Sequence, residues 1–292
     1  MLDKLKSILQ EPPPAMAFEI TEAGIASARI GARAEMGFAP LPAGVLDVSP
    51  LRDNVVDQES FAQTVRSLVP SLKQREIALI LPDFSTRTTV LDFDGFPSEP
   101  KEQAALIRFR LKRSLPFDSE TAALSYFAQP VAHKRIDVVA VLAPPEIVER
   151  YEAPFRAAGL NPGLVTTSSI AALELAPESG LSAMVKLSGR AISILVRQKS
   201  TLKLVRCLEL PSRSLDDIAA VLAPTLVYIE DNLGGRAERL ILCGFGAQSE
   251  EALRRFETEL GLSVETMRSP LGAPGENNAG LLGYLRSIAR DN

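Results

Sequence analysis

The chain of 292 residues has no tryptophan, one histidine and two cysteines, and only 5% of its residues are aromatic. Few aromatic side chains leave few surfaces on which unpaired bases could stack. A formal net charge of −4 gives no overall positive field for nucleic acid. We therefore expect no nucleic-acid partner. With 46% hydrophobic and 23% charged residues, the composition is that of a soluble globular protein, long enough for two domains or lobes.

The scarcity of histidine and cysteine also argues against a metal site. His133 lies in the polar stretch AHKRID and is expected in a loop. Cys207 and Cys243 are far apart, each in or beside an apolar strand-like run, which fits no zinc spacing. This predicts buried free thiols in a reducing compartment. Asp92 and Asp94 would share one face of a strand, which is compatible with a cation, although exposed edge charges are the commoner explanation.

Long apolar runs are absent as well. No segment approaches the roughly 18 apolar residues of a membrane-spanning helix, and no secretory signal is recognisable. Residues 1–10 place Leu2, Leu5, Ile8 and Leu9 on one helical face, which predicts a short helix packed on the body or frayed, with a membrane-surface contact as the alternative. We expect a cytoplasmic protein without a direct membrane span, attached to a membrane at most through a partner.

Strand and helix patterns alternate along the remaining chain, which predicts an α/β fold in two halves. Strands are expected in a hairpin over 15–33 and at 76–83, 85–97, 122–131, 136–144, 163–167, 182–187, 191–197, 201–210, 238–243 and 262–267. Helices are expected at 57–72, 98–115, 144–158, 168–176, 216–231, 249–261 and 280–289. Shifted by 167 positions, residues 18–30 overlay residues 185–197, each a strand, a small polar turn and a second strand. This match indicates an internal duplication.

Motifs of well-known enzyme classes are missing. There is no Gly-Lys pair, and so no P-loop, and no Gly-x-Ser-x-Gly elbow. The strongest local signal is GFGAQS at 244–249, which follows a strand and opens a helix, where backbone N–H groups could hold an anion. Glu265 has nearly the spacing of a dinucleotide-binding acid, but Ser249 replaces the third glycine. A tight turn that needs its glycines explains the stretch equally well.

One expected helix, over 98–115, is rich in basic residues. They are Lys101, Arg108, Arg110, Lys112 and Arg113. A solvated helix face is the ordinary explanation for such a charge pattern. A site for acidic lipid headgroups or for a partner's tail is the alternative.

The order of these elements resembles the actin-like ATPase superfold, and most closely the PilM family of type IV pilus assembly proteins. That family is similar to the cell-division actin homologue and to the cytoplasmic part of the type II secretion L protein. The resemblance runs from about Phe18 to Leu285. Its most specific stretches are IALILPDFSTRTTVLDFDGFP, RSLPFD, IDVVAVLAPPEIVERYEAPFRAAGLNPGLVTTSSIAALEL and LILCGFGAQSEEALRRFETELGLSVETM. It implies a duplicated, ribonuclease H-like, two-lobed fold with an inserted α+β subdomain.

The resemblance also implies a division of the chain. Residues 1–14 would be an N-terminal tail, and 15–83 with 161–180 the first lobe. Residues 84–160 would form the inserted, partner-binding subdomain, and 181–292 the second lobe.

The family's nucleotide-binding positions are largely replaced here. In the first hairpin the family's Asp is Glu19, its Gly is Thr21, its Ser positions are Glu22 and Ala23, and its Lys is Ala26; in the second hairpin its Asp is Lys186 and its Gly is Ser188. Only the adenosine turn keeps small residues, Gly244 and Gly246, with Phe245 between them. Phosphate binding needs bare backbone N–H groups, and magnesium needs carboxylates. We therefore expect no ATP hydrolysis, weak or absent Mg-ATP binding, no other cofactor, and a Glu19–Lys186 ion pair that closes the cleft.

Two functions follow from the resemblance. The first is a non-catalytic scaffold of a type IV pilus or type II secretion-like platform, peripheral to the inner membrane, which binds the cytoplasmic N-terminal tail of a PilN-like single-span membrane protein. The expected groove involves Arg87, Arg108, Pro116 and Phe117, with a second copy or an assembly ATPase as further partners. The alternative is a nucleotide-dependent actin-like ATPase or kinase-like enzyme, against which the replaced positions count.

Overall fold

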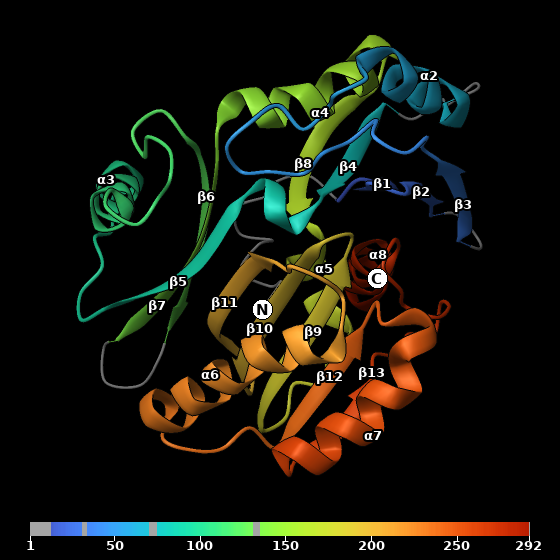
Figure 1. The fold of residues 1–292 in the computed structure, drawn as a ribbon. Coiled ribbons are helices and arrows are strands. Elements are labelled where there is room, and N and C mark those ends of the chain that lie inside the picture. The colour runs from blue at the N-terminus through green and yellow to red at the C-terminus, as the bar shows by residue number, and fades with distance from the viewer. Residues whose placement is uncertain (1–12, 31–33, 70–74, 131–134, 292) are drawn as a thin grey trace.

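The computed structural model describes residues 13–30, 34–69, 75–130 and 135–291. The expected helix over 1–10 and the loop at His133 lie outside these ranges. The described residues form two five-stranded sheets, one above the other in Figure 1, and a three-stranded sheet to one side. The sheets confirm the α/β class expected from the sequence.

The first lobe is built on a sheet in the order β3-β2-β1-β4-β8. Its strands are β1 (Met16–Thr21), β2 (Gly24–Arg29), β3 (Glu35–Pro40), β4 (Glu76–Leu81) and β8 (Asn161–Thr167). The first three are antiparallel neighbours, whereas β4 runs parallel to both β1 and β8. Helices α2 (Gln58–Leu68) and α4 (Pro145–Ala157) cover one face of this sheet through an apolar cluster that includes Phe18, Phe61 and Tyr151. Strand β3 was not expected, because its residues are mostly exposed and carry no apolar alternation that marks a buried face.

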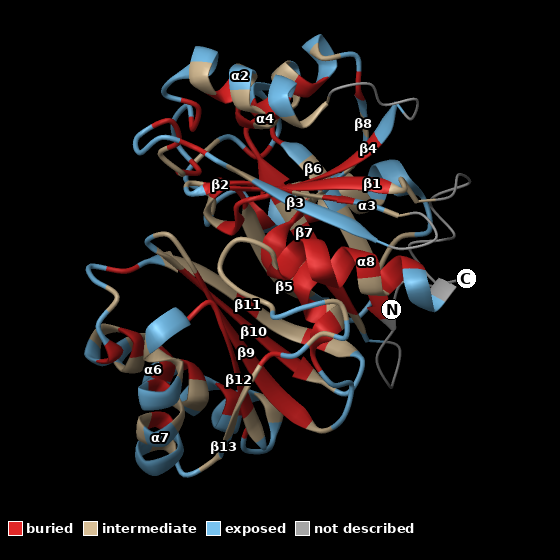
Figure 2. Cartoon of the chain, turned by 90° about the vertical axis from the view of Figure 1, so that its right-hand side faces the viewer, coloured by how far each residue is buried: buried red, intermediate tan, exposed pale blue. Residues whose placement is uncertain are grey.

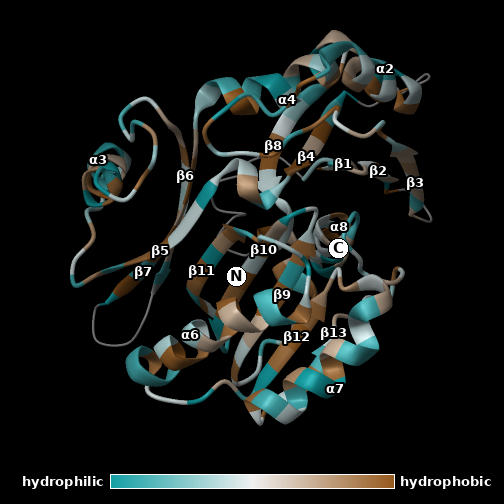
Figure 3. Cartoon of the chain, in the orientation of Figure 1, coloured by the Kyte–Doolittle hydropathy of each residue, from teal (hydrophilic) through white to brown (hydrophobic). Residues whose placement is uncertain are grey.

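The second lobe repeats this topology, with the sheet order β11-β10-β9-β12-β13. Its elements are β9 (Leu181–Ser188), β10 (Ala191–Gln198), β11 (Thr201–Glu209), β12 (Arg239–Cys243), β13 (Ser263–Thr266), α6 (Leu215–Leu233) and α7 (Ser249–Leu260). Again a three-stranded antiparallel meander is followed by two parallel strands. Strands β9, β10 and β12 are mostly hydrophobic, whereas α6 and α7 carry both polar and apolar residues (Figure 3). The repeated strand order confirms the internal duplication inferred from the matching hairpins.

The three-stranded sheet, in the order β5-β7-β6, forms a smaller unit. It comprises β5 (Arg87–Phe93), β6 (Ala123–Pro130) and β7 (Ile136–Ala143), with α3 (Pro100–Leu111) packed on one face through Phe93, Ile107 and Leu111. Its opposite side joins the second lobe. The Gln129 amide exchanges two hydrogen bonds with the backbone of Leu202 on β11, at 2.8 and 3.0 Å, and Lys203 Nζ lies 2.6 Å from Asp137 Oδ2. The inserted unit is therefore fixed to the second lobe as well as to the first, from which its chain emerges.

The two lobes share a core. Short α5 (Ser168–Ala172) and the last helix, α8 (Ala279–Asp291), pack together between the two sheets, and their cluster runs from Ala17 and Ile80 in the first sheet to Met184 in the second. Figure 2 shows α8 largely buried beneath the first sheet. The expected subdomain range 84–160 contains α4, which packs on the first lobe, and the expected second-lobe range contains α8, which contacts β1. These two helices thus pack on the first lobe although the expected ranges assign them to other parts. The expected domain boundaries stay a prediction.

Both cysteines are free, as the sequence predicted. Burial raises the pKa of the Cys207 thiol and of the Cys243 thiol to about 12. Cys243 Sγ lies 3.7 Å from the Gly275 carbonyl oxygen, and Ser193 Oγ lies 3.5 Å from Cys207 Sγ. Cys243 is buried and Cys207 is half-buried. Because the thiolate is the reactive form, thiols held protonated in this way are expected to react slowly.

We expect the folded protein to react very slowly with a disulfide reagent at pH 8, and both thiols to react at once in denaturant. Because the folded pKa is raised, stability from these thiols is present below the usual thiol pKa and is lost as the pH rises from about 9 toward 12. Absorbance of the released thiolate measures the first effect, and urea unfolding at several pH values the second. Single Cys→Ser variants assign the signal. Rapid labelling of either thiol without unfolding would contradict this account.

Candidate functional site

The turns of the two duplicated hairpins meet where the lobes face each other. Thr21 to Gly24 joins β1 to β2, and Ser188 to Ala191 joins β9 to β10. Four residues of these turns line one pocket: Glu22, Ser188, Arg190 and Ala191. A Cβ on Gly189 would overlap the Glu22 carboxylate. The hairpins therefore approach each other closely enough that Glu22 contacts the opposite turn.

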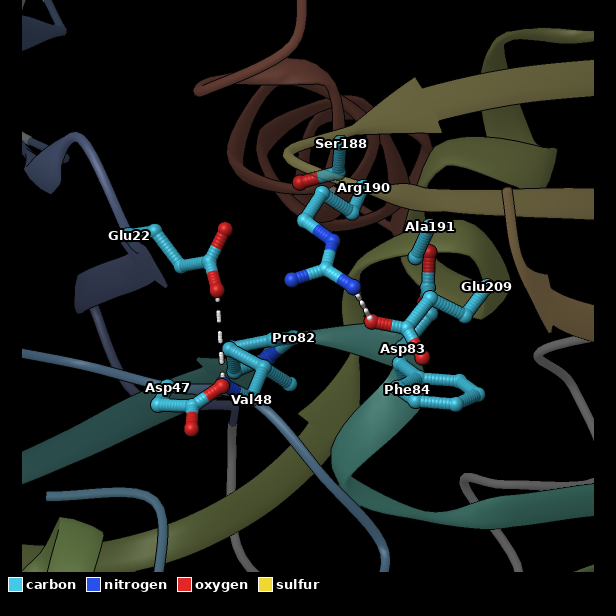
Figure 4. Close-up of a pocket in the computed structure, with 10 residues that line it drawn as sticks. All are labelled: Glu22, Asp47, Val48, Pro82, Asp83, Phe84, Ser188, Arg190, Ala191 and Glu209. Carbon is cyan, nitrogen blue, oxygen red and sulfur yellow. Dashed lines mark hydrogen bonds and ion pairs between the residues drawn. The ribbon is translucent and has the colours of Figure 1, made fainter. Parts of the chain in front are cut away.

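The pocket between the hairpins is small and acidic (Figure 4). It holds about 30 Å³ and is lined by Glu22, Asp47, Val48, Pro82, Asp83, Phe84, Ser188, Arg190, Ala191 and Glu209. The guanidinium of Arg190 lies 2.6 Å from the Glu209 carboxylate and thus forms an ion pair within the second lobe. Sites for ligands of nucleotide size occupy on the order of 300–1,000 Å³. The pocket in this structure is therefore about one tenth of the smallest such site.

Lys186 lies at the centre of the contact between the lobes. It projects from β9 with no exposed surface, and its Nζ lies 3.5 Å from Asp83 Oδ2, which follows β4 of the first lobe. Ser193 Oγ on β10 donates to the same Asp83 oxygen at 2.9 Å, and the Ser169 backbone N–H donates to the other at 2.6 Å. Burial disfavours the ammonium, but the charges of Asp83 and Glu19 hold the pKa of Lys186 above its usual value. The lysine is therefore a buried cation with its counter-ion on the other lobe.

The expected Glu19–Lys186 ion pair is therefore wrong, because Lys186 pairs with Asp83 instead. Glu19 has no exposed surface, and its carboxylate accepts hydrogen bonds from Ser168 Oγ and, at 2.7 Å, from the Leu281 backbone N–H in the first turn of α8. Burial raises the pKa of Glu19, and the nearby charge of Lys186 opposes that rise. Because free N–H groups of a first helical turn attract a carboxylate, α8 takes Glu19 and leaves Lys186 to Asp83. Asp83 was not identified from the sequence as the partner of Lys186. Its position just after a buried strand was the signal that could have indicated it.

The remaining first-hairpin positions do not form a phosphate cradle. Thr21 is buried, and its Oγ1 donates to the Gly24 carbonyl at 3.1 Å, which closes the turn. Glu22 Oε1 accepts from the Val48 backbone N–H at 3.3 Å and places negative charge at the opposite turn. In the described part of the chain, no group of three or more His, Cys, Asp or Glu could hold a metal ion. These residues do not fit a magnesium nucleotide.

The candidate adenosine turn has structural reasons for its residues. Gly244 has φ +81°, and a Cβ there would overlap the Leu187 carbonyl oxygen of β9. Phe245 is buried in the second-lobe core, where its ring lies edge-on to Phe256 with centroids 6.3 Å apart. Gly246, with φ +52°, opens the 3₁₀ turn that leads into α7. Glu265 pairs with Arg239 at 3.6 Å on the adjacent strand, so its spacing has a structural explanation too.

The four candidate groove residues lie toward one end of the three-stranded sheet. Arg87 begins β5 and stands over the Phe84 ring at 5.8 Å. Arg87 on β5 is paired with Leu142 on β7, which is paired in turn with Leu124 on β6. The three residues form one row across the sheet. Phe117 packs against the apolar core of this unit, while Pro116 is exposed. The structure thus places Arg87 and Phe117 in the same unit.

Among the basic residues of this helix and its end, Arg108 has an internal role and the others lie at the surface. Arg108 donates to the carbonyl oxygens of Ser119 and Ala122, so it fixes the loop before β6 and is not free for a partner. Arg110 lies 3.9 Å from Asp92, which also pairs with Arg135 at 3.5 Å. Asp92 is therefore an exposed edge charge, as the commoner explanation held. Lys101, Lys112 and Arg113 are solvent-exposed, and so is Phe109 on the same helix, whose side chain is 76% exposed.

No protein-family model matches the sequence, and no curated protein matches it either. Solved structures do match over nearly the whole chain. The PilM–PilN type IV pilus biogenesis complex aligns with a TM-score of 0.76 and 18% identity, covering 95% of this chain and 99% of that chain. A Bacteroides thetaiotaomicron protein of unknown function with an actin-like ATPase fold gives 0.56 and 14%, covering 97% and 98%.

The cytoplasmic domain of EpsL, an inner-membrane component of the Vibrio cholerae type II secretion system, gives a TM-score of 0.53 and 14% identity, covering 94% of each chain. Across the described ranges, no helix is long and apolar enough to span a bilayer. Similarity at these identities concerns the fold, and it agrees with the duplicated sheets and the inserted unit described above. The chain has the actin-like ATPase fold, in the two-lobed form shared with PilM.

Proposed function

We propose that this protein is a non-catalytic, PilM-like scaffold at the cytoplasmic side of the inner membrane, in a type IV pilus or type II secretion-like assembly platform. Its partner would be the cytoplasmic N-terminal tail of a PilN-like single-span membrane protein. The observation that carries the proposal is the pairing of full-length similarity to a PilM–PilN structure with a closed, acidic cleft between the lobes.

The state of the cleft supports the non-catalytic part. A scaffold needs the two-lobed shape but no phosphate chemistry, and here charges of the chain itself meet between the lobes beside their shared apolar core. The Lys186–Asp83 pair joins the lobes, and the remaining space between the hairpins is lined by carboxylates. Carboxylates repel phosphate groups, and this repulsion is strong where water is scarce. We therefore propose that this cleft does not support ATP hydrolysis.

The row Arg87, Leu142 and Leu124 supports the partner-binding part. Leu142 is fully buried in the cluster that α3 covers, whereas Leu124 and Phe117, which pack against that cluster, are only partly buried, and Arg87 is half-buried against Phe84. An extended peptide could place apolar side chains against Leu124 and Phe117 and a carboxylate against Arg87. Because Arg108 is bound internally, we assign the charged contact to Arg87.

We expect the purified protein to capture, from detergent-solubilised membranes of its source, a small single-span membrane protein with a short cytoplasmic N-terminal tail. A synthetic peptide of that tail should then bind in solution, and Arg87→Glu should weaken binding by at least about tenfold, since a lost charge-assisted contact of 1.4 kcal/mol has that effect. Mass spectrometry identifies the captured protein, and fluorescence anisotropy measures the peptide affinity.

Arg66→Glu on α2 is the matched control, because Arg66 is an exposed arginine on another element. It should leave peptide affinity unchanged, and adding Mg-ATP should also leave it unchanged, with no phosphate released. Capture of soluble proteins alone would count against the pilus assignment. Phosphate release that depends on the wild-type protein would favour the actin-like ATPase alternative.

A further inference from the structure

Glu276, in the loop between β13 and α8, makes polar contacts to the turn of the second hairpin and to an arginine. Its Oε1 accepts a hydrogen bond from the Gly189 backbone N–H at 2.6 Å. Both of its carboxylate oxygens also lie within hydrogen-bond distance of Arg213 Nη1, at 2.9 and 3.0 Å. A turn N–H and a guanidinium are the donors that proteins use to bind phosphate oxygens.

The same arginine joins three segments that are distant in sequence. Arg213 Nη2 donates to the Gly244 carbonyl oxygen at 2.9 Å, so it links the GFG turn to the Glu276 loop and, through Glu276, to the second hairpin. The side chains of Arg213 and Glu276 are 37% and 28% exposed. Water therefore reaches this pair, and neither charge is trapped in an apolar core that would force the pairing.

The turn that Glu276 occupies is the duplicate of the first hairpin turn. Gly189 has φ +56° and lies in the turn, beyond the last pair of the ladder between β9 and β10, Ser188 with Ala191. On the other side, the Glu22 carboxylate lies where a Gly189 side chain would be. Two carboxylates thus converge on one glycine, one from each lobe, and only Glu276 has a cationic partner here.

We propose that the Gly189 N–H and the Arg213 guanidinium form a site for a phosphate-class anion, which the chain fills with its own Glu276. This inference rests on the proposed absence of nucleotide from the cleft. It names what takes the place of a bound phosphate: a carboxylate held on the loop that leads into α8. Because α8 packs beneath the first sheet, the contact also ties the second hairpin to the helix that both lobes share.

Removing the Glu276 carboxylate tests the site directly. Glu276→Ala should lower the melting temperature, and inorganic phosphate should restore it by about 2–4 °C at ten times its dissociation constant, at fixed ionic strength. The wild-type protein should not respond. Glu22→Gln combined with Glu276→Ala should bind phosphate more tightly than Glu276→Ala alone, because one repelling charge is gone. Arg213→Met added to Glu276→Ala should abolish the response.

Glu265→Ala is the matched control, since Glu265 is also a half-exposed glutamate paired with an arginine of the second lobe. Its melting temperature should not depend on phosphate. If Glu276→Ala fails to fold, Glu276→Gln with phosphate binding followed by ³¹P NMR replaces it. Inorganic phosphate and ADP are titrated separately, and a response to either supports the site and identifies the source of the anion. A response to neither overturns it.

The outcomes also separate this inference from the proposed function. Mg-ATP binding by the wild-type protein would contradict the proposed function, whatever the variants do. A wild-type protein that ignores Mg-ATP, together with a Glu276→Ala variant that ignores phosphate, would contradict the anion site alone.

Discussion

Replacing Lys186 by methionine should destabilise the protein by about 3–5 kcal/mol, the usual cost of removing one member of a buried ion pair. The side chain has no exposed surface, and it is the cation that lies between Asp83 and Glu19. Methionine fills a similar volume but leaves both carboxylates buried without their counter-charge. Since burial already raises the pKa of Glu19, that group would take up a proton more readily in the variant.

Urea unfolding followed by circular dichroism measures the loss. Lys186→Met combined with Asp83→Asn should recover part of the stability, because the pair is then removed as a whole. Arg52→Met is the surface control: Arg52 pairs with Asp47 at 2.6 Å, but its side chain is 62% exposed, so the change should cost about 0–1 kcal/mol. If the free energy of unfolding of Lys186→Met lay within about 1 kcal/mol of the wild-type value, the ion pair would contribute little to stability.

Gly283→Ala should destabilise the protein by about 2–3 kcal/mol, as overpacking of a close contact does. Helix α8 crosses α5 so closely that a Cβ on Gly283 would overlap the Ala171 carbonyl oxygen and lie 2.8 Å from Ala172 Cα. These are backbone atoms of a neighbouring helix, which cannot rotate away as a flexible side chain can. The intrinsic preference of a helix for alanine over glycine, about 1 kcal/mol, acts in the opposite direction.

Gly235→Ala provides the control, because a Cβ there would meet only Leu181 Cδ2, at 3.9 Å. That change should leave the free energy of unfolding within about 0.5 kcal/mol of the wild type. Thermal and urea unfolding of both variants give the comparison. A more stable Gly283→Ala protein would show that helix propensity outweighs the contact, and that α5 and α8 can move apart at little cost.

Much of the fold could be predicted from local patterns. Alternating and continuous apolar runs predicted strands such as β4 and β12, and the match between residues 18–30 and 185–197 predicted the duplication that the two sheets share. These features are encoded within a few neighbouring residues, because a strand or helix exposes one face and buries the other at a fixed period. Strand β3 was missed for the same reason, since it is exposed on nearly every residue.

The replaced positions of the candidate nucleotide cleft could also be identified from the sequence, because each lies at a fixed place in a hairpin. Thr21 ends β1 at the first hairpin turn and Lys186 lies on β9 of the second hairpin, and their correspondence to the family's nucleotide positions stays a prediction. The chemistry of the side chains alone then indicated that the positions suit neither phosphate nor magnesium.

Only the tertiary structure decided which charges meet. Lys186 pairs with Asp83 rather than Glu19, and Glu276 reaches Gly189 from a loop rich in glycine and proline that carried no signal. Helix α8, last in the chain, lies beneath the first sheet and takes the Glu19 carboxylate. Periodicity specifies the face that an element buries, but the partner of a buried charge depends on which distant elements supply donors and acceptors at that point. That arrangement follows from packing the two lobes and α8 against one another, which no local pattern encodes.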